Sequence, residues 1–289
     1  TEKALWRFHD TPQPTITAVK LEVAVYPHVP KVVTRGSYTI QNRTGAPLDD
    51  VHVRFPDRDL KVLGFAVQGA HEKASYGRFG YHILEFDVPM QPGESRTMTF
   101  ETVREQRGFK NGAPWTAVVD NGTFLNDFDV APVLGMDRLG LLQDRSKRRK
   151  YGLPPELRVP KLGDPAAARF RLIRHDSDWV SADITLSTDA VQTPIAPGYQ
   201  VSSTVADGRR TARFVTEAPI LHFFSMQSAR YAVKTVNDQG VAISVYYHPD
   251  HPWNVDRMIR TAEAGLAYYD ANFSPCQFRQ LRCLEFPAP

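Results

Sequence analysis

The chain of 289 residues has little cysteine, little net charge and no long apolar run. A formal net charge of +3 is too small to indicate nucleic acid as a partner. No apolar stretch approaches the ~20 residues of a membrane-spanning helix, and the first ten residues lack the apolar core of a signal peptide. With 42% apolar and 23% charged residues, the composition is that of an ordinary globular protein.

The only cysteines are Cys276 and Cys283, which flank one short segment. A disulfide between them would close a small loop and add little stability. Two unpaired cysteines packed in or near a core are the commoner arrangement. The sequence leaves open whether Cys276 and Cys283 are bridged.

Familiar catalytic motifs are also missing. The one His-Glu pair is His71-Glu72, and Ser75 stands where a zinc-peptidase helix needs its second histidine. We expect this segment to be a loop. His248 and His251 lie among prolines that keep them off a helix, so a strand-to-helix connection is favoured over a metal site. The sequence therefore predicts no catalytic residue and no metal ligand in this chain.

What the chain does contain is a long series of short strands. Between residues 16 and 26, apolar and polar side chains alternate with a period of two, as in a strand with one buried face. Asp207-Gly208 between two such runs is a strong hairpin signal. Further strands are expected at 32–40, 51–55, 60–67, 81–88, 96–103, 115–119, 180–186, 220–224, 231–236 and 241–247. The fold class is thus mainly β, with large curved or sandwich-like antiparallel sheets.

One long helix and a strand follow the strands. Asn254 is a good N-cap residue, and Pro275 must end the helix. One helical face is apolar at Val255, Met258, Ile259, Ala262, Leu266 and Tyr269. A short strand is expected at 278–287.

The densest charge cluster is a basic run with two interpretations. It consists of Arg145, Lys147, Arg148, Arg149 and Lys150. A solvated turn is the usual meaning of such a run, and an anionic membrane surface is the alternative partner. Trp115 and Trp179 allow a sugar-binding face, although aromatic side chains in strands more often belong to a core.

The C-terminal segments 268–278 (YYDANFSPCQF) and 281–287 (LRCLEFP) resemble the opening of the catalytic domain in the aminopeptidase N family of zinc metallopeptidases. Three positions depart from the family's turn: Ser274 replaces a glycine, Cys276 a tyrosine and Gln277 a proline. Upstream, the segments 21–23, 36–40, 231–233 and 241–246 resemble the start and end of the family's saddle-shaped β domain.

The resemblance implies a division into a saddle-like β domain at 1–250, with a possible subdivision near 108–167, and a truncated catalytic domain at 251–289. The β region would pack on the catalytic domain and wall a peptide cleft. Zinc and the catalytic side chains would lie in the rest of a parent protein that removes N-terminal residues from peptides. By position, Asn121 or Asn126 would supply the side-chain amide that meets the substrate's amino group.

A second interpretation involves no catalysis. The chain could be an extracytoplasmic β-rich interaction or sensor domain of a permease-like membrane protein, because some bacterial relatives carry such a region after a multi-span part. The two interpretations differ in the sequence expected after Pro289.

Overall fold

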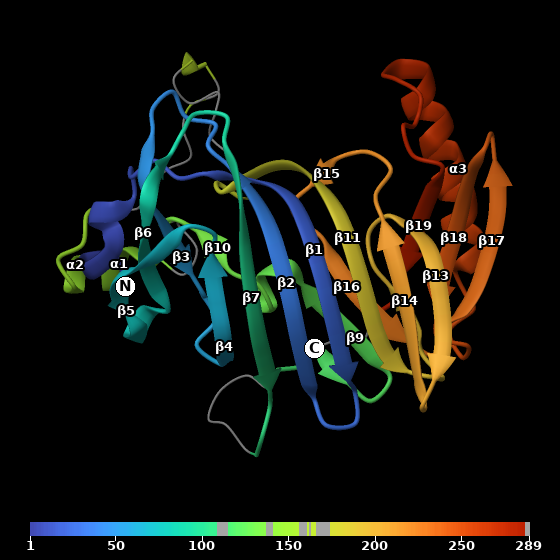
Figure 1. The fold of residues 1–289 in the computed structure, drawn as a ribbon. Coiled ribbons are helices and arrows are strands. Elements are labelled where there is room, and N and C mark those ends of the chain that lie inside the picture. The colour runs from blue at the N-terminus through green and yellow to red at the C-terminus, as the bar shows by residue number, and fades with distance from the viewer. Residues whose placement is uncertain (109–114, 137–140, 156–160, 162, 166–173, 287–289) are drawn as a thin grey trace.

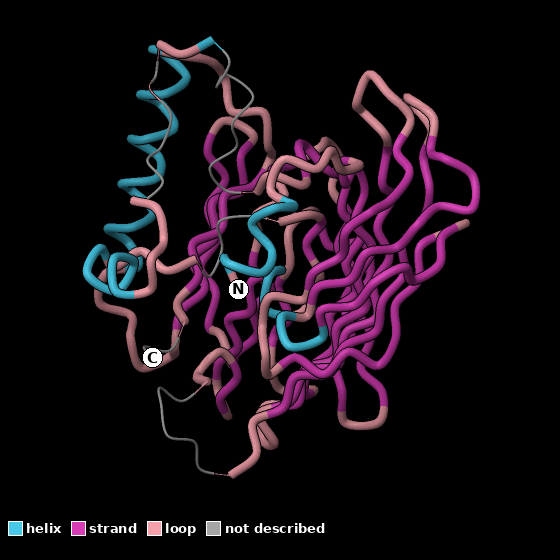
Figure 2. Tube along the Cα trace, turned by 90° about the vertical axis from the view of Figure 1, so that its left-hand side faces the viewer, coloured by secondary structure: helices cyan, strands magenta, loops and turns pink. Residues whose placement is uncertain are grey.

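The computed structural model describes residues 1–289 apart from 109–114, 137–140, 156–160, 162, 166–173 and 287–289 (Figure 1). About half of the described chain is strand, and α3 is its one long helix (Val255–Asn272). Among the described residues, no helix is long and apolar enough to cross a membrane. Figure 2 shows α3 standing beside the layers of strands.

Eight strands form one large curved sheet (Figure 1). They are β1 (Thr15–Tyr26), β2 (Lys31–Gln41), β4 (Leu60–Val67), β7 (Ser95–Glu105), β11 (Ser177–Asp189), β13 (Tyr199–Ala206), β14 (Arg209–Val215) and β15 (Ile220–Leu221). The order is β13-β14-β11-β1-β2-β7-β4, with β15 also paired to β11. All pairs are antiparallel except β1 with β11, which run parallel.

Two four-stranded sheets pack against the large one. The first contains β3 (Leu48–Arg54), β5 (Ala70–Tyr76), β6 (Tyr81–Met90) and β10 (Val133–Leu134). The second contains β8 (Val118–Val119), β9 (Gly122–Asn126), β12 (Thr193–Ile195) and β16 (Ser225–Ala229). The main core draws on inward positions of all three sheets, including Leu21, Leu84, Leu125 and Met226. Alternating apolar residues thus produce the buried faces that the sequence predicts.

A separate small sheet closes the C-terminal end. It has the order β17 (Ala232–Asp238), β18 (Val241–Tyr247) and β19 (Gln280–Leu284). The chain leaves β18, forms α3 and returns as β19 parallel to β18. Val255 and Ile259 of α3 pack on Val245 of this sheet. The helix and strand expected at the C-terminus are therefore confirmed.

Short helices lie at the other end of the large sheet: α1 (Glu2–Leu5), η1 (Trp6–Phe8), η2 (Gly77–Phe79) and α2 (Arg145–Lys150), with η3 (Asp127–Asp129) following β9. The basic run forms α2. Figure 1 shows α1 and α2 close together and α3 at the opposite side.

Several details differ from the sequence-based predictions. His71 and Glu72 lie in β5 rather than in a loop, because β5 pairs with β6 along its length. Only Val118–Val119 and Ile220–Leu221 are strands within the predicted 115–119 and 220–224. Asn254 is the N-cap of α3, but its side chain makes no capping hydrogen bond. The two cysteines are unbridged and half-buried.

Candidate functional site at the junction with the C-terminal unit

Polar contacts join β19 to the loop before β13. The Arg282 guanidinium donates to the carbonyls of Ala196 and Gly198 at 2.9 and 3.1 Å. The Gln280 amide donates to the same Gly198 carbonyl at 2.8 Å. The Arg279 backbone N–H donates to the Tyr199 hydroxyl at 2.9 Å. These bonds fix the C-terminal unit against one edge of the large sheet.

Glu285, immediately after β19, holds the segment that leads into α3. Its carboxylate accepts the His248 backbone N–H at 2.6 Å and pairs with the His251 ring. The Glu285 backbone carbonyl accepts the Tyr231 hydroxyl at 2.8 Å. Partial burial opposes the charge, yet the hydrogen bonds from His248 and His251 hold the pKa of Glu285 below its usual value.

The two histidines thus serve the strand-to-helix connection, as the sequence favoured. Their rings lie 4.9 Å apart, and His251 stacks on Trp253. Sequence reasoning missed Glu285 as their partner because it lies more than 30 residues away. Across the described part of the chain, no group of three or more His, Cys, Asp or Glu side chains could hold a metal ion.

Only one end of the α3 apolar face is covered. Val255 and Ile259 are 5% exposed, whereas Met258 is 42% exposed and Tyr269 60%. Trp253, Tyr268 and Phe273 are exposed as well. Several large apolar side chains exposed on and beside one helix mark a candidate interaction site. Because the helix lies at the edge of the molecule (Figure 1), this surface is open to a partner.

Of the predicted amide residues, Asn121 precedes β9 and Asn126 ends it, and β9 also contacts the C-terminal segment. Phe124 of β9 packs on Phe286 with ring centroids 4.7 Å apart. The Asn121 side-chain oxygen accepts the Arg230 backbone N–H at 2.8 Å. Asn126 caps η3 in a capping box with Asp129. The Asn121 oxygen and the Asn126 backbone N–H, which donates to the Asp129 carboxylate at 2.9 Å, therefore already take part in local structure.

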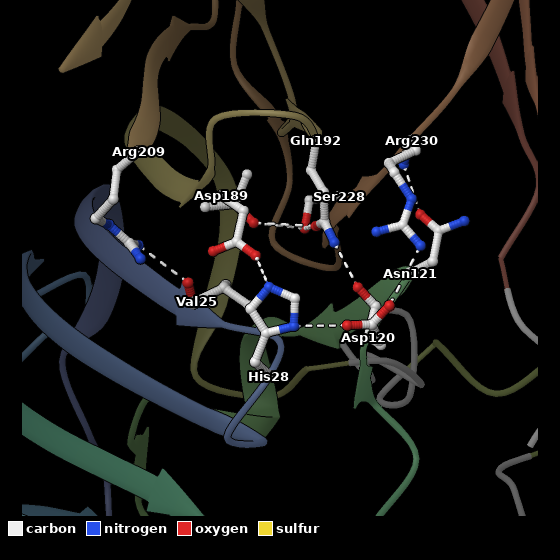
Figure 3. Close-up of polar contacts among 10 residues, drawn as sticks. Val25, His28, Asp120, Asn121, Asp189, Gln192, Arg209, Ser228 and Arg230 are labelled. Carbon is white, nitrogen blue, oxygen red and sulfur yellow. Dashed lines mark hydrogen bonds and ion pairs between the residues drawn. The ribbon is translucent and has the colours of Figure 1, made fainter. Parts of the chain in front are cut away.

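Next to Asn121, an imidazole bridges two carboxylates (Figure 3). His28, in the β1–β2 turn, lies 2.6 Å from Asp120 through Nδ1 and 2.7 Å from Asp189 through Nε2. Arg230 pairs with the other oxygen of Asp120 at 3.2 Å. Hydrogen bonds from Arg230 and His28 lower the pKa of Asp120. This cluster ties the β1–β2 turn to the ends of β8, β11 and β16, and it has no local sequence signal.

A buried hydroxyl–amide network lies behind this cluster (Figure 3). The Gln192 oxygen accepts from Ser228 at 2.9 Å and from Thr188 at 3.1 Å, and its amide N–H donates to the Asp120 carbonyl at 2.8 Å. Ser228 thus donates to an amide oxygen, and its hydrogen bonds within the described chain are to Gln192 and Thr188 rather than to a base. These bonds join the ends of β11 and β16 to the segment after β8.

The basic run is divided between two environments. The Arg148 side chain is 3% exposed and forms a two-bond ion pair with Glu2 at 2.7 and 2.9 Å. The other four cations, Arg145, Lys147, Arg149 and Lys150, are exposed. The prediction that Arg148 faces a membrane is therefore wrong, because its charge is neutralised inside the protein.

A second buried ionic network lies in the main core. Arg174 donates to Asp176 through Nε at 2.8 Å and Nη2 at 2.6 Å, and to Asp127 at 2.6 Å. The His222 ring lies 3.1 Å from Arg174. Burial, opposed by Arg174, raises the pKa of Asp127 to about 6, whereas burial and the Arg174 charge lower that of His222 to about 3. All four side chains are buried, with at most 5% of their surface exposed.

Trp115 and Trp179, the two tryptophans considered for a sugar-binding face, behave differently. Trp115 packs against the main core, with the Arg104 guanidinium 4.5 Å from its ring, as expected of a core aromatic. Trp179 on β11 is 55% exposed. One exposed tryptophan on a strand is normal at a protein surface and carries no sugar-binding argument.

Comparison with known proteins finds solved structures with a similar fold but no match by sequence. No known protein-family description matches the chain, and neither does any curated protein. A mutant M1 zinc metallopeptidase of Deinococcus radiodurans, bound to a Tyr-Ser-Ala substrate, is 13% identical at a TM-score of 0.63; the alignment covers 98% of this chain and 58% of that one. Aminopeptidase A of Legionella pneumophila in complex with aspartic acid is 9% identical at a TM-score of 0.60, over 95% of this chain and 29% of that one.

The similarity runs from the first strands to β19, since a second structure of the Deinococcus metallopeptidase covers 96% of this chain and 57% of its own at a TM-score of 0.60 and 12% identity. The resemblance that the C-terminal segments indicate is confirmed at the level of fold. This chain has the fold of the N-terminal region of M1 zinc metallopeptidases and spans well under two thirds of the length of those proteins.

Proposed function

We propose that this chain is the non-catalytic N-terminal region of an aminopeptidase N-like zinc metallopeptidase. In this proposal, residues 1–250 form the β domain and 251–289 open the catalytic domain, which continues beyond the chain. The observation that carries it is the half-covered apolar face of α3, on a fold shared with zinc metallopeptidases.

The packing surface would consist of α3 and β19. Burying apolar area contributes about 25 cal/mol per Å², so the exposed Met258, Tyr269 and Phe273 are strong candidates for contacts with further chain. Among the described strands, β19 pairs only with β18, which leaves its other edge available for the same partner. Figure 1 shows α3 and β19 at the same side of the molecule.

The β region would also wall the peptide cleft. The Phe124–Phe286 contact supports this, because it sets β9 beside the segment that leads onward from β19. Asn121 or Asn126 would then meet the substrate's amino group. Zinc in the parent would polarise the scissile carbonyl and lower the pKa of its bound water to about 7. None of the described residues here would hold that metal.

The test is to express the chain with its native downstream sequence and compare it with residues 1–289 alone. The extended protein should contain one zinc by elemental analysis and hydrolyse aminoacyl anilides. Hydrogen exchange in α3 should slow relative to the short chain, because its open face becomes covered. An extended protein without zinc, and with α3 exchange unchanged, would refute the proposal.

We also propose that the four exposed cations of α2 contact an anionic membrane surface. Each cation near such a surface is worth about 1 kcal/mol, so four on one short helix suffice for weak attachment. Figure 1 shows α2 at the opposite side of the molecule from α3. This position supports the proposal, because a membrane at α2 would not obstruct the packing of further chain on α3.

A further inference from the structure

The imidazole of His28 holds two carboxylates at once, which requires a particular protonation state (Figure 3). Its Nδ1 lies 2.6 Å from Asp120 and its Nε2 lies 2.7 Å from Asp189, and both are hydrogen-bonding distances. A neutral imidazole has one N–H and one lone pair, whereas an imidazolium has two N–H donors. A neutral ring would direct its lone pair at one of the two carboxylates. The bridge in the structure is therefore that of a protonated ring.

Charged and titratable side chains from several elements surround this ring. They are Tyr26 and Lys31 on either side of the β1–β2 turn, Asp120, Asp189, Arg209 and Arg230. Arg209 and Lys31 lie over the Tyr26 ring, at 4.4 and 5.7 Å from its centre. Hydrogen bonds from Arg230 and His28 lower the pKa of Asp120, which keeps that carboxyl ionised. Among these side-chain types, only imidazole ordinarily titrates between pH 5 and 8.

Loss of the ring proton breaks the link between the two carboxylates. One N–H remains, and it can donate to Asp120 or to Asp189 but not to both. The Asp120 side chain is 62% exposed and that of Asp189 is 20% exposed, so Asp120 has more freedom to turn away. The β8–β9 turn would then be held by Arg230 and by the Gln192 amide, without its tie to the β1–β2 turn.

Asn121 follows Asp120 directly, and its side-chain oxygen accepts the Arg230 backbone N–H at 2.8 Å. We propose that the proton on His28 regulates the position of the β8–β9 turn and thereby of Asn121. His28 is a positioning residue, which holds the turn at acid pH and releases it as the pH rises. The effect on a substrate rests on the proposed function, in which Asn121 or Asn126 meets the substrate's amino group. The position of the turn does not depend on it.

The test is backbone hydrogen exchange of the 289-residue chain at pH 5.5 and pH 8.0, expressed as protection factors so that the intrinsic pH dependence cancels. The reporters are the Arg230 amide and the amides of the β8–β9 pair. The ladder of β3 with β6 is the internal reference for global stability. Relative to that reference, protection of the reporters should fall about threefold between the two pH values, a size expected of networked surface ion pairs.

Two substitutions of His28 should have opposite effects. His28→Gln cannot carry the charge, so its reporters should show the low protection at both pH values. His28→Arg carries a permanent charge and several donors, so it should keep the high protection at both. His71→Gln is the matched control, because His71 is 60% exposed, against 64% for His28, and pairs with Asp87 on another sheet. It should behave as the wild type does.

Equal protection at the two pH values in the wild type, a pH difference that persists in His28→Gln, or loss of protection at pH 8.0 in His28→Arg would overturn the proposal. These measurements need neither zinc nor a peptide. An extended protein without zinc would therefore refute the proposed function and leave the exchange result intact. In an active extended protein, KM should rise about threefold from pH 5.5 to 8.0 relative to its value in His28→Arg, with little change in kcat.

Discussion

At the scale of single residues, Arg148 illustrates how one charge in a cluster can differ from its neighbours. Five cations occupy six consecutive positions, yet only Arg148 points inward, where it meets Glu2 from the start of the chain. Breaking such a buried pair leaves a charge without compensation, which costs about 3–5 kcal/mol. The neighbouring Arg149 is exposed and carries no such role.

We therefore expect Arg148→Met to lower the free energy of unfolding by about 3 kcal/mol, because the Glu2 carboxylate stays buried and unpaired. Urea denaturation measures the change. Arg149→Met, the matched control one residue away, should leave the midpoint unchanged. Equal midpoints for the two variants would mean that the Glu2–Arg148 pair has no net effect.

His222 gives a prediction on pH. Its pKa is lowered to about 3 by burial and by Arg174, so the folded state prefers the neutral ring. This contribution is fully present above the unfolded pKa of about 6.5 and is lost as the pH falls toward 3. The wild type should thus lose more stability on acidification over this window than His222→Gln does.

Asp127 acts in the opposite direction. Its raised pKa of about 6 gives stability below its ordinary value of 3.8 that disappears as the pH rises through 6. The wild-type curve alone is therefore ambiguous, and the difference between wild type and His222→Gln, measured by urea denaturation at pH 4 to 7, is the informative quantity. A flat difference would show that the buried ring is not held neutral.

At the scale of elements, the loop before β13 depends on Gly198. The residue has a φ of +91°, and an added Cβ would lie 2.5 Å from the Val215 backbone. Gly208 in the β13–β14 hairpin also has a positive φ, of +72°, but a Cβ there would meet open space. Substitutions at the two glycines therefore distinguish the cost of a left-handed backbone from the cost of steric overlap.

Gly208→Ala should cost about 1 kcal/mol from the left-handed backbone alone. Gly198→Ala should cost more than about 2 kcal/mol, because the Val215 backbone must also move. Thermal or urea unfolding distinguishes the two. Similar losses would indicate that the 195–199 loop adjusts easily.

Two neighbouring residues of helix α3 allow a comparable pair of substitutions. Ile259→Ala removes a side chain that packs on Val245 and should destabilise the chain by about 2 kcal/mol. Met258→Ala, one position earlier on the open face, should change stability by less than about 0.5 kcal/mol. A large effect of Met258→Ala in the 289-residue chain would contradict the assignment of this face to a missing partner.

Much of this element structure could be predicted from local pattern. Alternation predicts β1, β2 and β11, and Asp207-Gly208 predicts the β13–β14 hairpin, where both turn residues have positive φ. β5 was not predicted because AHEKASY has no alternation and gains its ladder only from β6. The residues of the junction could not be found from sequence, since Arg282 and Glu285 meet partners in distant parts of the chain.

At the scale of the whole molecule, α2 and α3 lie at opposite ends, which gives the membrane proposal a direct test. The chain should sediment with vesicles that contain phosphatidylserine at low salt, and release at high salt, because the attraction is electrostatic. Replacing Arg145, Lys147, Arg149 and Lys150 by glutamine should abolish it. Retained binding by that variant, or none by the wild type, would refute the proposal.

The parallel pairing of β1 with β11 also governs how the molecule can be made. The two strands are neighbours at the centre of the large sheet, yet about 160 residues of chain separate them. At ribosomal rates of 5–20 residues per second, the partner of β1 emerges roughly 8–30 s after β1 itself. During that interval one edge of β1 has no native neighbour, so a nascent chain of this protein needs protection from aggregation until residue 189 has cleared the exit tunnel.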